Sequence, residues 1–366
     1  MSATGFAHRR EKLWHLVRNQ PADGILVSDP VNVTYLTGFT GEDSFLLCGD
    51  GQATLISDGR FTLQIAEECP DVEPFIRPGH VTLHEAVAKV VKKLRWRRLA
   101  IESAAITLDG HNELKAKLEG VELVPTKNLV EELRQIKDDT EIEHIREAVR
   151  IAERALTVIR ALCLSRRTEK ELQTELEYQM RRIGADGVAF PPIVAVGPRS
   201  ALPHAVPTGR ELGQGQWILF DWGAKARGYC SDLTRVLLPK KLPAKIRKIY
   251  ETVLAAQQAA IEVIRPGVPA SEVDKAARTV IAAARLGKYF NHGLGHGVGL
   301  QVHERPRLSP TSQDILQPGM VVTVEPGVYL PDFGGVRIED DVLVTRDGHE
   351  VLTTAPKEID EVLLWD

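Results

Sequence analysis

Four carboxylates and one imidazole in the C-terminal part of the chain are side chains that bind hard divalent cations. In chain order they are Asp221, Asp232, His296, Glu325 and Glu339, and each lies in a short glycine-rich or strand-like segment. Oxygen ligands with one imidazole suit a pair of such cations, and a cation pair can activate water for peptide-bond hydrolysis. The residue types and their order therefore predict a dinuclear metal centre with hydrolytic chemistry.

A hairpin is expected to bring the first two carboxylates together. The runs WILFDWGAK and YCSDLTRVLL are strand-like, and a two-residue turn at Ala226 and Arg227 would place Asp221 opposite Asp232. Opposed side chains have Cβ atoms about 5 Å apart, so the two carboxylates could share metal ions. The apolar run 217–220 argues against two simply solvated acids.

The later acidic residues follow two further strand-like runs. Glu325 ends the apolar part of MVVTVEPGVYL. In GGVRIEDDVLV, strand alternation puts Arg337, Glu339 and Asp341 on one face. The alternative to metal binding in this run is a structural ion pair of Arg337 with Glu339 or Asp341. We prefer such a structural network for Asp340 and Asp341.

Histidines gather near the expected metal centre. His292, His296 and His303 lie in NHGLGHGVGLQVHE, where alternating glycines would leave room for a ligand beside the imidazole of His296. A lone histidine is more often structural, but three in one short glycine-rich segment favour a functional site. His204 lies in GPRSALPHAVP, a turn-rich segment of the kind that often carries functional residues.

The N-terminal part of the chain alternates between helical and strand-like patterns. Residues 6–20 have a helical period, and GILVSD and SFLLCGDGQATLISD read as strands, the second as a pair joined at residues 49–51. A helix in HEAVAKVVKKLRW, a strand in LAIES, a helix in HNELKAKLEG and a strand in VELVP follow. This order predicts an α/β domain, and we place its boundary at residues 132/133.

Helices are also expected to frame the C-terminal strands. The capping-box spacing of Thr140 and Glu143 predicts the start of the first helix, and Ser271 is a candidate cap of the last. The predicted helices cover residues 139–164, 167–183, 243–264 and 270–285.

Composition excludes some classes of protein. The 366 residues are 43% apolar and 26% charged with a net charge of −4, which is ordinary for two globular domains and argues against nucleic acid as a partner. The sequence has neither a signal-peptide pattern nor about 18 consecutive apolar residues, so we expect a soluble, cytoplasmic protein with no membrane partner. Scattered cysteines predict reduced, buried thiols at Cys48, Cys69, Cys163 and Cys230.

The motifs GPRSALPHA, DWGAKARGYCSDLTR, HGLGHGVGLQVHE, VEPGVY and RIEDD resemble those of the pita-bread-fold metallopeptidases. Within that family they resemble the proline-specific group of aminopeptidase P and prolidase. The first 130 or so residues resemble the creatinase-type N-terminal domain. The resemblance implies an α/β (α+β) chain with a creatinase-like domain at 1–132 and a pita-bread catalytic domain at 133–366.

The resemblance also implies roles for the five metal ligands. Asp221 would bind one metal, His296 and Glu325 the other, and Asp232 and Glu339 would bridge both. Thr234 would orient a bridging carboxylate. Two divalent ions are expected, with Mn²⁺ preferred and Co²⁺ or Zn²⁺ as alternatives, because the site is rich in oxygen ligands.

Further residues would surround the substrate. The resemblance implies that His204 and His303 contact the scissile amide and the tetrahedral intermediate, while Glu325 or a bridging carboxylate accepts the proton of the attacking water. His292 would lie further along the pocket. Arg307 would receive the terminal carboxylate of a dipeptide, and Arg337 is also expected to bind substrate.

These features predict hydrolysis of Xaa-Pro bonds in short peptides by a homodimer, with the dipeptidase activity favoured. The alternatives are an aminopeptidase acting on longer peptides and, more remotely, a peptide-binding protein without catalysis. Five clustered charges are costly to bury, which argues against the binding protein. Four positions differ from the residues that are common in these motifs, and none of them is a predicted ligand: Gln301, Arg305, Val196 and Val236.

Overall fold

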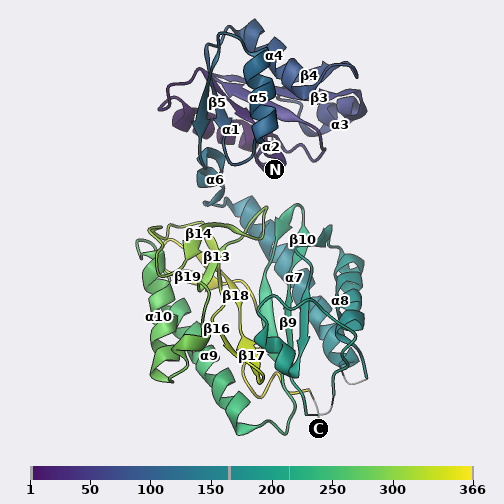
Figure 1. The fold of residues 1–366 in the computed structure, drawn as a ribbon, viewed down its shortest axis with the longest axis vertical. Coiled ribbons are helices and arrows are strands. Elements are labelled where there is room, and N and C mark those ends of the chain that lie inside the picture. Colours follow the sequence, from purple (N-terminus) through teal and green to yellow (C-terminus); the bar gives the residue numbers. More distant parts are fainter. Residues whose placement is uncertain (1–2, 164–165, 214, 365–366) are drawn as a thin grey trace. The chain divides into compact units, whose positions relative to one another are not determined.

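The computed structural model describes residues 3–163, 166–213 and 215–364. These residues form two compact units, Met1–Arg134 and Gln135–Asp366. Both units combine helices with strands, as Figure 1 shows, which confirms the mixed α/β class predicted from the sequence.

The N-terminal unit is built on one six-stranded sheet with the order β4-β3-β2-β1-β5-β6. The neighbours β1, β2 and β3 pair antiparallel, whereas β4, β5 and β6 join through parallel pairs. The strands are β1 (Gly24–Val27), β2 (Phe45–Gly49), β3 (Gln52–Asp58), β4 (Glu73–Arg77), β5 (Arg98–Glu102) and β6 (Glu122–Thr126).

Helices in this unit include both predicted and unpredicted elements. The predicted ones are α1 (Ala3–Val17), α4 (Leu83–Leu94) and α5 (Leu108–Lys117). The sequence analysis missed β4 and the short helices α2 (Pro30–Thr37), α3 (Thr62–Glu68) and α6 (Leu129–Arg134), and the 3₁₀ turn η1 (Gly59–Phe61). A signal for α2 was present, because Asp29 caps it, Pro30 starts it and Gly38 ends it at φ 81°.

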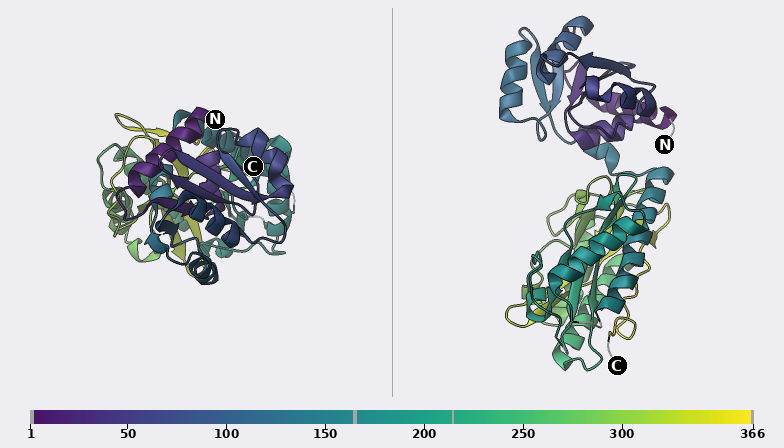
Figure 2. Two further views of the ribbon diagram at one scale, coloured as in Figure 1. Left: turned by 90° about the horizontal axis from the view of Figure 1, so that it is seen from above. Right: turned by 90° about the vertical axis from the view of Figure 1, so that its right-hand side faces the viewer.

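Four long helices in the C-terminal unit confirm the predicted ones. They are α7 (Asp139–Leu162), α8 (Glu169–Ile183), α9 (Ala244–Glu262) and α10 (Ala270–Ala283). The predicted end of the first at residue 164 lies outside the described residues. Helix α7 packs on α8 and α9 packs on α10, and the side view of Figure 2 shows α7 and α8 covering the strands behind them.

The predicted caps of these helices were wrong. Helix α7 has its capping box at Asp138 and Glu141, whose side chains and backbone amides exchange hydrogen bonds of 2.9 Å, so Thr140 already lies inside the helix. Ser271 lies in the first turn of α10, whose N-cap is Pro269 without a side-chain cap.

The C-terminal strands form four small sheets, with the orders β11-β10-β7, β12-β9-β8, β14-β13-β15-β18-β19 and β16-β17. A bridge between Thr234 and Glu339 connects β12 to the segment before β18. The first group of strands is β7 (Gly187–Val188), β8 (Ile193–Val196), β9 (Ile218–Trp222), β10 (Ala224–Ala226), β11 (Tyr229–Cys230) and β12 (Leu233–Leu237). The second group is β13 (Gly295–Gly297), β14 (Glu304–Leu308), β15 (Val321–Val324), β16 (Gly327–Leu330), β17 (Gly334–Arg337), β18 (Asp340–Val344) and β19 (His349–Val351). Two 3₁₀ turns, η2 (Gly197–Ala201) and η3 (Gly287–Tyr289), complete the unit.

The predicted hairpin is present, but its predicted register was wrong. The turn residues are Arg227 and Gly228, with φ of 50° and 82°, so Asp221 pairs with Thr234 and not with Asp232. A two-residue hairpin turn with both residues at positive φ favours glycine at its second position. Asp232 consequently lies at the break between β11 and β12.

The core of the C-terminal unit surrounds β9. All five residues of β9 are buried, and the Trp222 indole nitrogen donates to the carbonyl of Ala152 in α7 at 3.0 Å. Asp221 therefore lies on a strand that is buried throughout. The four cysteines are buried and free, as predicted. Among the described residues, no helix is long and apolar enough to cross a membrane.

Candidate metal centre

Three of the five predicted ligands converge on one point from distant parts of the chain. Single ligand atoms of Asp232, His296 and Glu339 all lie within 4.8 Å of one another. Asp232 lies between β11 and β12, His296 is the middle residue of β13, and Glu339 lies between β17 and β18. The arrangement brings two carboxylates and an imidazole to one small, largely buried volume.

Glu325 joins this cluster beside His296. Its Oε1 atom is 3.2 Å from His296 Nε2, and the same nitrogen is 3.8 Å from Oδ2 of Asp232. Thr323 Oγ1 donates to Glu325 Oε1 at 3.2 Å and accepts the backbone amide of His296 at 3.0 Å. Thr323 thereby fixes Glu325 relative to the backbone of its neighbour His296.

Asp221 is connected to the cluster through Arg337 and Thr234. Arg337 Nη2 donates to Asp221 Oδ2 at 2.5 Å, and its Nε donates to Thr234 Oγ1 at 3.0 Å. Thr234 Oγ1 in turn donates to Glu339 Oε2 at 2.6 Å, which is the contact expected for Thr234. The alternative pairing of Arg337 with Glu339 or Asp341 does not form among the described residues, because Arg337 pairs with Asp221, which the hairpin register places next to Thr234.

The contacts of Arg337 continue to His292 through Tyr329. Arg337 Nη1 donates to the Tyr329 hydroxyl at 2.8 Å, and that hydroxyl is 3.0 Å from His292 Nε2. His292 Nδ1 lies 2.7 Å from the carbonyl of Gly293, so Nδ1 carries the proton and Nε2 accepts from Tyr329. Burial lowers the pKa of His292, which keeps the ring neutral in this role. A continuous chain of hydrogen bonds thus connects His292 with Asp221.

Sequence reasoning missed Tyr329. Its phenol is buried, and burial raises its pKa to about 12. The position of Tyr329 in VEPGVY was the only signal. Strand alternation cannot show that the phenol reaches a guanidinium on the next strand.

The electrostatics of the cluster favour bound cations. Burial raises the pKa of Asp232 and Glu339 well above the usual range, and the neighbouring carboxylates raise it further. Burial also raises the pKa of Asp221, and its Oδ1 atom is buried without a hydrogen-bond partner among the described residues. Burial opposes ionisation of Glu325, but the hydrogen bond and charge of His296 lower its pKa. Hard oxygen ligands in an acid-rich, buried volume fit a pair of divalent cations.

His303, His204 and Arg307 lie around this cluster and are exposed. The rings of His303 and His296 are in edge contact, with centroids 4.4 Å apart. Burial is the main cause of the shifted pKa values of Asp221 and His303, and the charge of His204 lowers both values, so His204 lies within electrostatic range of these two groups. Arg307 is the direct cross-strand partner of His296, and such partners point to the same face of a sheet.

The two acids after Glu339 differ in their surroundings. Asp340 forms the structural network expected of it with Arg235, Lys357, Gln257 and Thr353, and its pKa falls to about 2 despite burial. The structural network preferred for Asp341 was wrong, because this residue has no ion pair among the described residues and its Oδ1 is buried without a hydrogen-bond partner there. Its Oδ2 accepts the backbone amide of Asp232 at 3.0 Å, and burial raises its pKa to about 8.

The alternating glycines around His296 have a different role from the predicted one. A Cβ atom at Gly295 would lie 2.1 Å from the carbonyl oxygen of Thr323, and one at Gly297 would lie 2.1 Å from that of Arg305. These glycines therefore allow β14 and β15 to approach β13 closely, rather than making room for a ligand.

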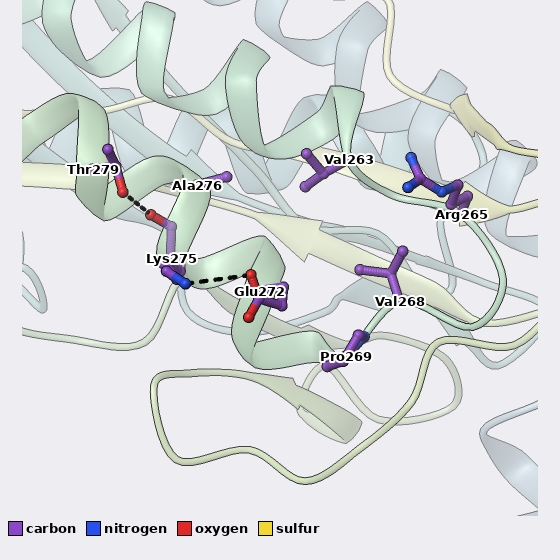
Figure 3. Close-up of a pocket in the computed structure, with 8 residues that line it drawn as sticks. All are labelled: Val263, Arg265, Val268, Pro269, Glu272, Lys275, Ala276 and Thr279. Atoms are coloured by element: carbon purple, nitrogen blue, oxygen red, sulfur yellow. Dashed lines mark hydrogen bonds and ion pairs between the residues drawn. The ribbon is translucent and has the colours of Figure 1, made fainter.

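A surface pocket elsewhere in this unit contains none of these residues. It lies beside the first two turns of α10 and the loop that precedes them, and its rim carries Arg265, Glu272 and Lys275 (Figure 3). Lys275 and Glu272 are 3.7 Å apart and form a loose ion pair. The pocket has no cluster of carboxylates and histidines and is not the candidate site.

Comparison with known proteins places both parts of the chain. The model of metallopeptidase family M24 matches residues 143–346, and that of the creatinase/prolidase N-terminal domain matches residues 9–136. An Xaa-Pro dipeptidase of Pyrococcus furiosus is 35% identical over 96% of this chain and 99% of its own length. These matches confirm the resemblance drawn from the motifs.

Solved structures of both proline-specific activities are similar to the chain. The Xaa-Pro dipeptidase from Bacillus anthracis has a TM-score of 0.93 and 38% identity, covering 100% of both chains. The X-Pro aminopeptidase from Thermotoga maritima MSB8 has a TM-score of 0.89 and 34% identity, covering 98% of this chain and 100% of its own. The fold is therefore shared by the dipeptidase and the aminopeptidase.

Proposed function

The chain belongs to metallopeptidase family M24, and from this premise we propose that it is an Xaa-Pro dipeptidase that uses two divalent cations, with Mn²⁺ preferred. The observation that carries the proposal is the pairing of His296 with Arg307 across β13 and β14. It puts an exposed guanidinium on the same face as a metal ligand. A dipeptide has its carboxylate directly after the scissile bond, within reach of such a guanidinium.

The proposed ligand roles follow the contacts of each side chain. Asp221, which is already paired with Arg337, would bind one cation. His296 and Glu325, which lie 3.2 Å apart, would bind the other. Asp232 and Glu339 would bridge the two, because each is buried, rich in negative neighbours and close to His296.

The surrounding side chains would handle the substrate and its protons. Bound divalent cations supply Lewis acidity for the attack of water on a peptide carbonyl. Glu325 would accept a proton in its ionised form, and the hydrogen bond and charge of His296, which lower its pKa against the effect of burial, keep it ionised at neutral pH while weakening it as a base. The exposed His303, in contact with His296, would donate a hydrogen bond to the developing oxyanion. His204 would interact with the leaving proline nitrogen.

Arg307 would determine the length of the substrate. A guanidinium can hold a carboxylate through paired, charge-assisted hydrogen bonds. Burial and the charge of His296 lower the pKa of His303, and the charge of Arg307 lowers it further, so Arg307 lies within electrostatic range of His303. A dipeptide carboxylate bound to Arg307 would therefore leave the scissile carbonyl beside His303 and the metal ligands. The buried Arg337, held by Asp221, Thr234 and Tyr329, would act on substrate through these residues.

An Xaa-Pro aminopeptidase is the second candidate. This candidate is favoured by the similarity of the chain to the X-Pro aminopeptidase of Thermotoga maritima, which is nearly as great as its similarity to the Xaa-Pro dipeptidase of Bacillus anthracis. A binding protein without catalysis is disfavoured, because ionised Asp232 and Glu339 would repel each other without cations. The homodimer and the cytoplasmic location stay predictions.

Two substrates and one variant test the proposal. Metal-loaded protein should release alanine from Ala-Pro faster than from Ala-Pro-Ala. Arg307→Ala should raise KM for Ala-Pro by about 10-fold or more, the range for loss of a charge-assisted pair, and should change Ala-Pro-Ala much less. The longer peptide is the matched control, since it uses the same metal centre. Equal losses on both peptides, or cleavage of Ala-Pro-Ala alone, would favour the aminopeptidase.

A further inference from the structure

Two apolar side chains of the loop that carries His204 remain exposed to water. The loop runs from the end of β8 through η2 and covers residues 197–208. Leu202 is 51% exposed and Val206 is 77% exposed, and His204 between them is also exposed. Side chains that remain in water gain no hydrophobic stabilisation from one loop conformation. Ala205 and Pro207 are buried, and polar contacts add to the order that a catalytic histidine requires.

A buried carboxylate ties the two ends of this loop together. Glu169, the first residue of α8, has no solvent exposure. Its Oε1 accepts the backbone amide of Val196 at 2.8 Å, just before the loop. Its Oε2 accepts the backbone amide of Thr208 at 2.8 Å and the Thr208 hydroxyl at 2.7 Å, at the far end. One side chain thus closes the loop at its base.

Arg199 extends this hold to the neighbourhood of His204. Its Nε lies 3.0 Å from both carboxylate oxygens of Glu169, and its Nη2 donates to the carbonyl of Val206 at 2.6 Å. Val206 is only two residues after His204. Arg337 also donates to the carbonyl of Pro203, at a longer distance of 3.4 Å.

We propose that Glu169 and Arg199 are positioning residues that hold His204 against the substrate. The proposal rests on the proposed function of His204 in peptide hydrolysis. Neither residue is within the metal cluster, so both would act only through the conformation of the loop. A charge-assisted pair that also bonds the backbone fixes a loop more firmly than either contact alone. The pair would keep His204 within the small range of positions that catalysis tolerates.

The decisive experiment is a double-mutant cycle between Arg199 and His204, with Ala-Pro as the substrate. Arg199→Ala should lower kcat by about 10-fold or more, the effect of misplacing a catalytic group, with little change in KM or metal content. In the His204→Ala background the same substitution should have no further effect on kcat. Arg146→Ala is the matched control, because Arg146 also forms a two-bond ion pair, with Glu350 at 2.6 and 2.7 Å, but away from this loop. It should leave kcat unchanged.

The outcomes separate this inference from the proposed function. An equal fall of kcat in both backgrounds, or no fall in either, would overturn the positioning role while leaving the function intact. Parent activity in His204→Ala would overturn the catalytic assignment of His204 itself. If Arg199→Ala does not fold, Thr208→Val removes one hydrogen bond to Glu169. Thr208→Val should lower kcat by a smaller factor, and only when His204 is present. A fall in kcat that does not depend on His204, or no fall at all, would overturn the inference.

Discussion

Replacing Asp232 by asparagine should have opposite effects on the metal-free and the metal-loaded protein. In the metal-free protein, Asp232 is a buried carboxylate whose pKa is raised by burial and by the charges of Glu339 and Asp221. Removing its charge should therefore stabilise that form. In the loaded protein the same substitution removes a ligand expected to be shared by both cations, and it should weaken metal binding and turnover together.

The distances in the cluster set the magnitude. Ligand atoms of Asp232 and Glu339 lie within 4.8 Å, and two unit charges at that distance repel by about 3.5 kcal/mol at an effective dielectric constant of about 20. Metal-free Asp232→Asn should thus gain up to about 3 kcal/mol where both acids are ionised. Metal at about 100 times its dissociation constant stabilises a protein by about 2.7 kcal/mol. The Asp232→Asn variant should lose this metal-dependent stabilisation.

Hydrogen exchange of peptides covering β9 and β12 would measure these changes within the C-terminal unit. Samples with chelator and with Mn²⁺ would be compared for the parent and for Asp232→Asn, alongside metal content by plasma emission and turnover of Ala-Pro. Asp340→Asn is the matched control, because Asp340 is an equally buried acid that is paired with Arg235 and Lys357. Breaking that network should destabilise both forms by about 3–5 kcal/mol.

Two results would refute the reasoning. Two bound metals with full turnover in Asp232→Asn would show that the carboxylate is not a shared ligand. A metal-free variant less stable than the metal-free parent would show that repulsion does not dominate the cluster. Both substitutions replace a buried aspartate with asparagine. The test is therefore whether the metal-free protein becomes more stable in Asp232→Asn and less stable in Asp340→Asn.

Three further predictions concern other parts of the same unit. His303→Ala should retain its metals and lose about 10²-fold in turnover, as loss of a transition-state donor does, and loss of metal would contradict this role. Lys137→Met should destabilise the unit by about 3–5 kcal/mol in urea unfolding, because it removes a buried ion-pair partner of Glu304, and Glu304→Gln in addition should restore part of the loss. The chelator-treated protein should lose stability as pH rises from about 4 through the raised pKa of Asp232 and Glu339, since the folded state holds protons that the unfolded state releases. Urea unfolding at several pH values checks this slope, and a rise in stability with pH would contradict it.

The sequence predicted the C-terminal helices and the three residues whose ligand atoms converge, Asp232, His296 and Glu339, but it did not predict the hairpin register. Either Ala226 and Arg227 or Arg227 and Gly228 could form a two-residue turn, and only the second pair puts glycine at a position of positive φ. Choosing the first pair placed Asp232 opposite Asp221, where Thr234 lies. The error is local, yet it concealed how Thr234 reaches Glu339.

Tertiary contacts decided the start of α7. The run DDTEIEH contains two overlapping capping boxes, one beginning at Asp138 and one at Thr140. The preceding residue Lys137 is fixed by its backbone bond to Gly319 and by a buried ion pair with Glu304. These long-range contacts hold the chain just before Asp138 and make it the first residue available as a cap. Local sequence could not distinguish the two.

The distribution of positive charge within the cluster supports the assignment of bridging ligands independently of the motifs. Asp221 receives the guanidinium of Arg337, and Glu325 receives the imidazole of His296 at 3.2 Å. Burial and the neighbouring carboxylates raise the pKa of Asp232 and Glu339 well above the usual range, and burial raises the pKa of Asp341, which accepts the Asp232 amide, to about 8. The demand for external positive charge is therefore high at Asp232 and Glu339, the two carboxylates proposed to contact both cations, and at their neighbour Asp341.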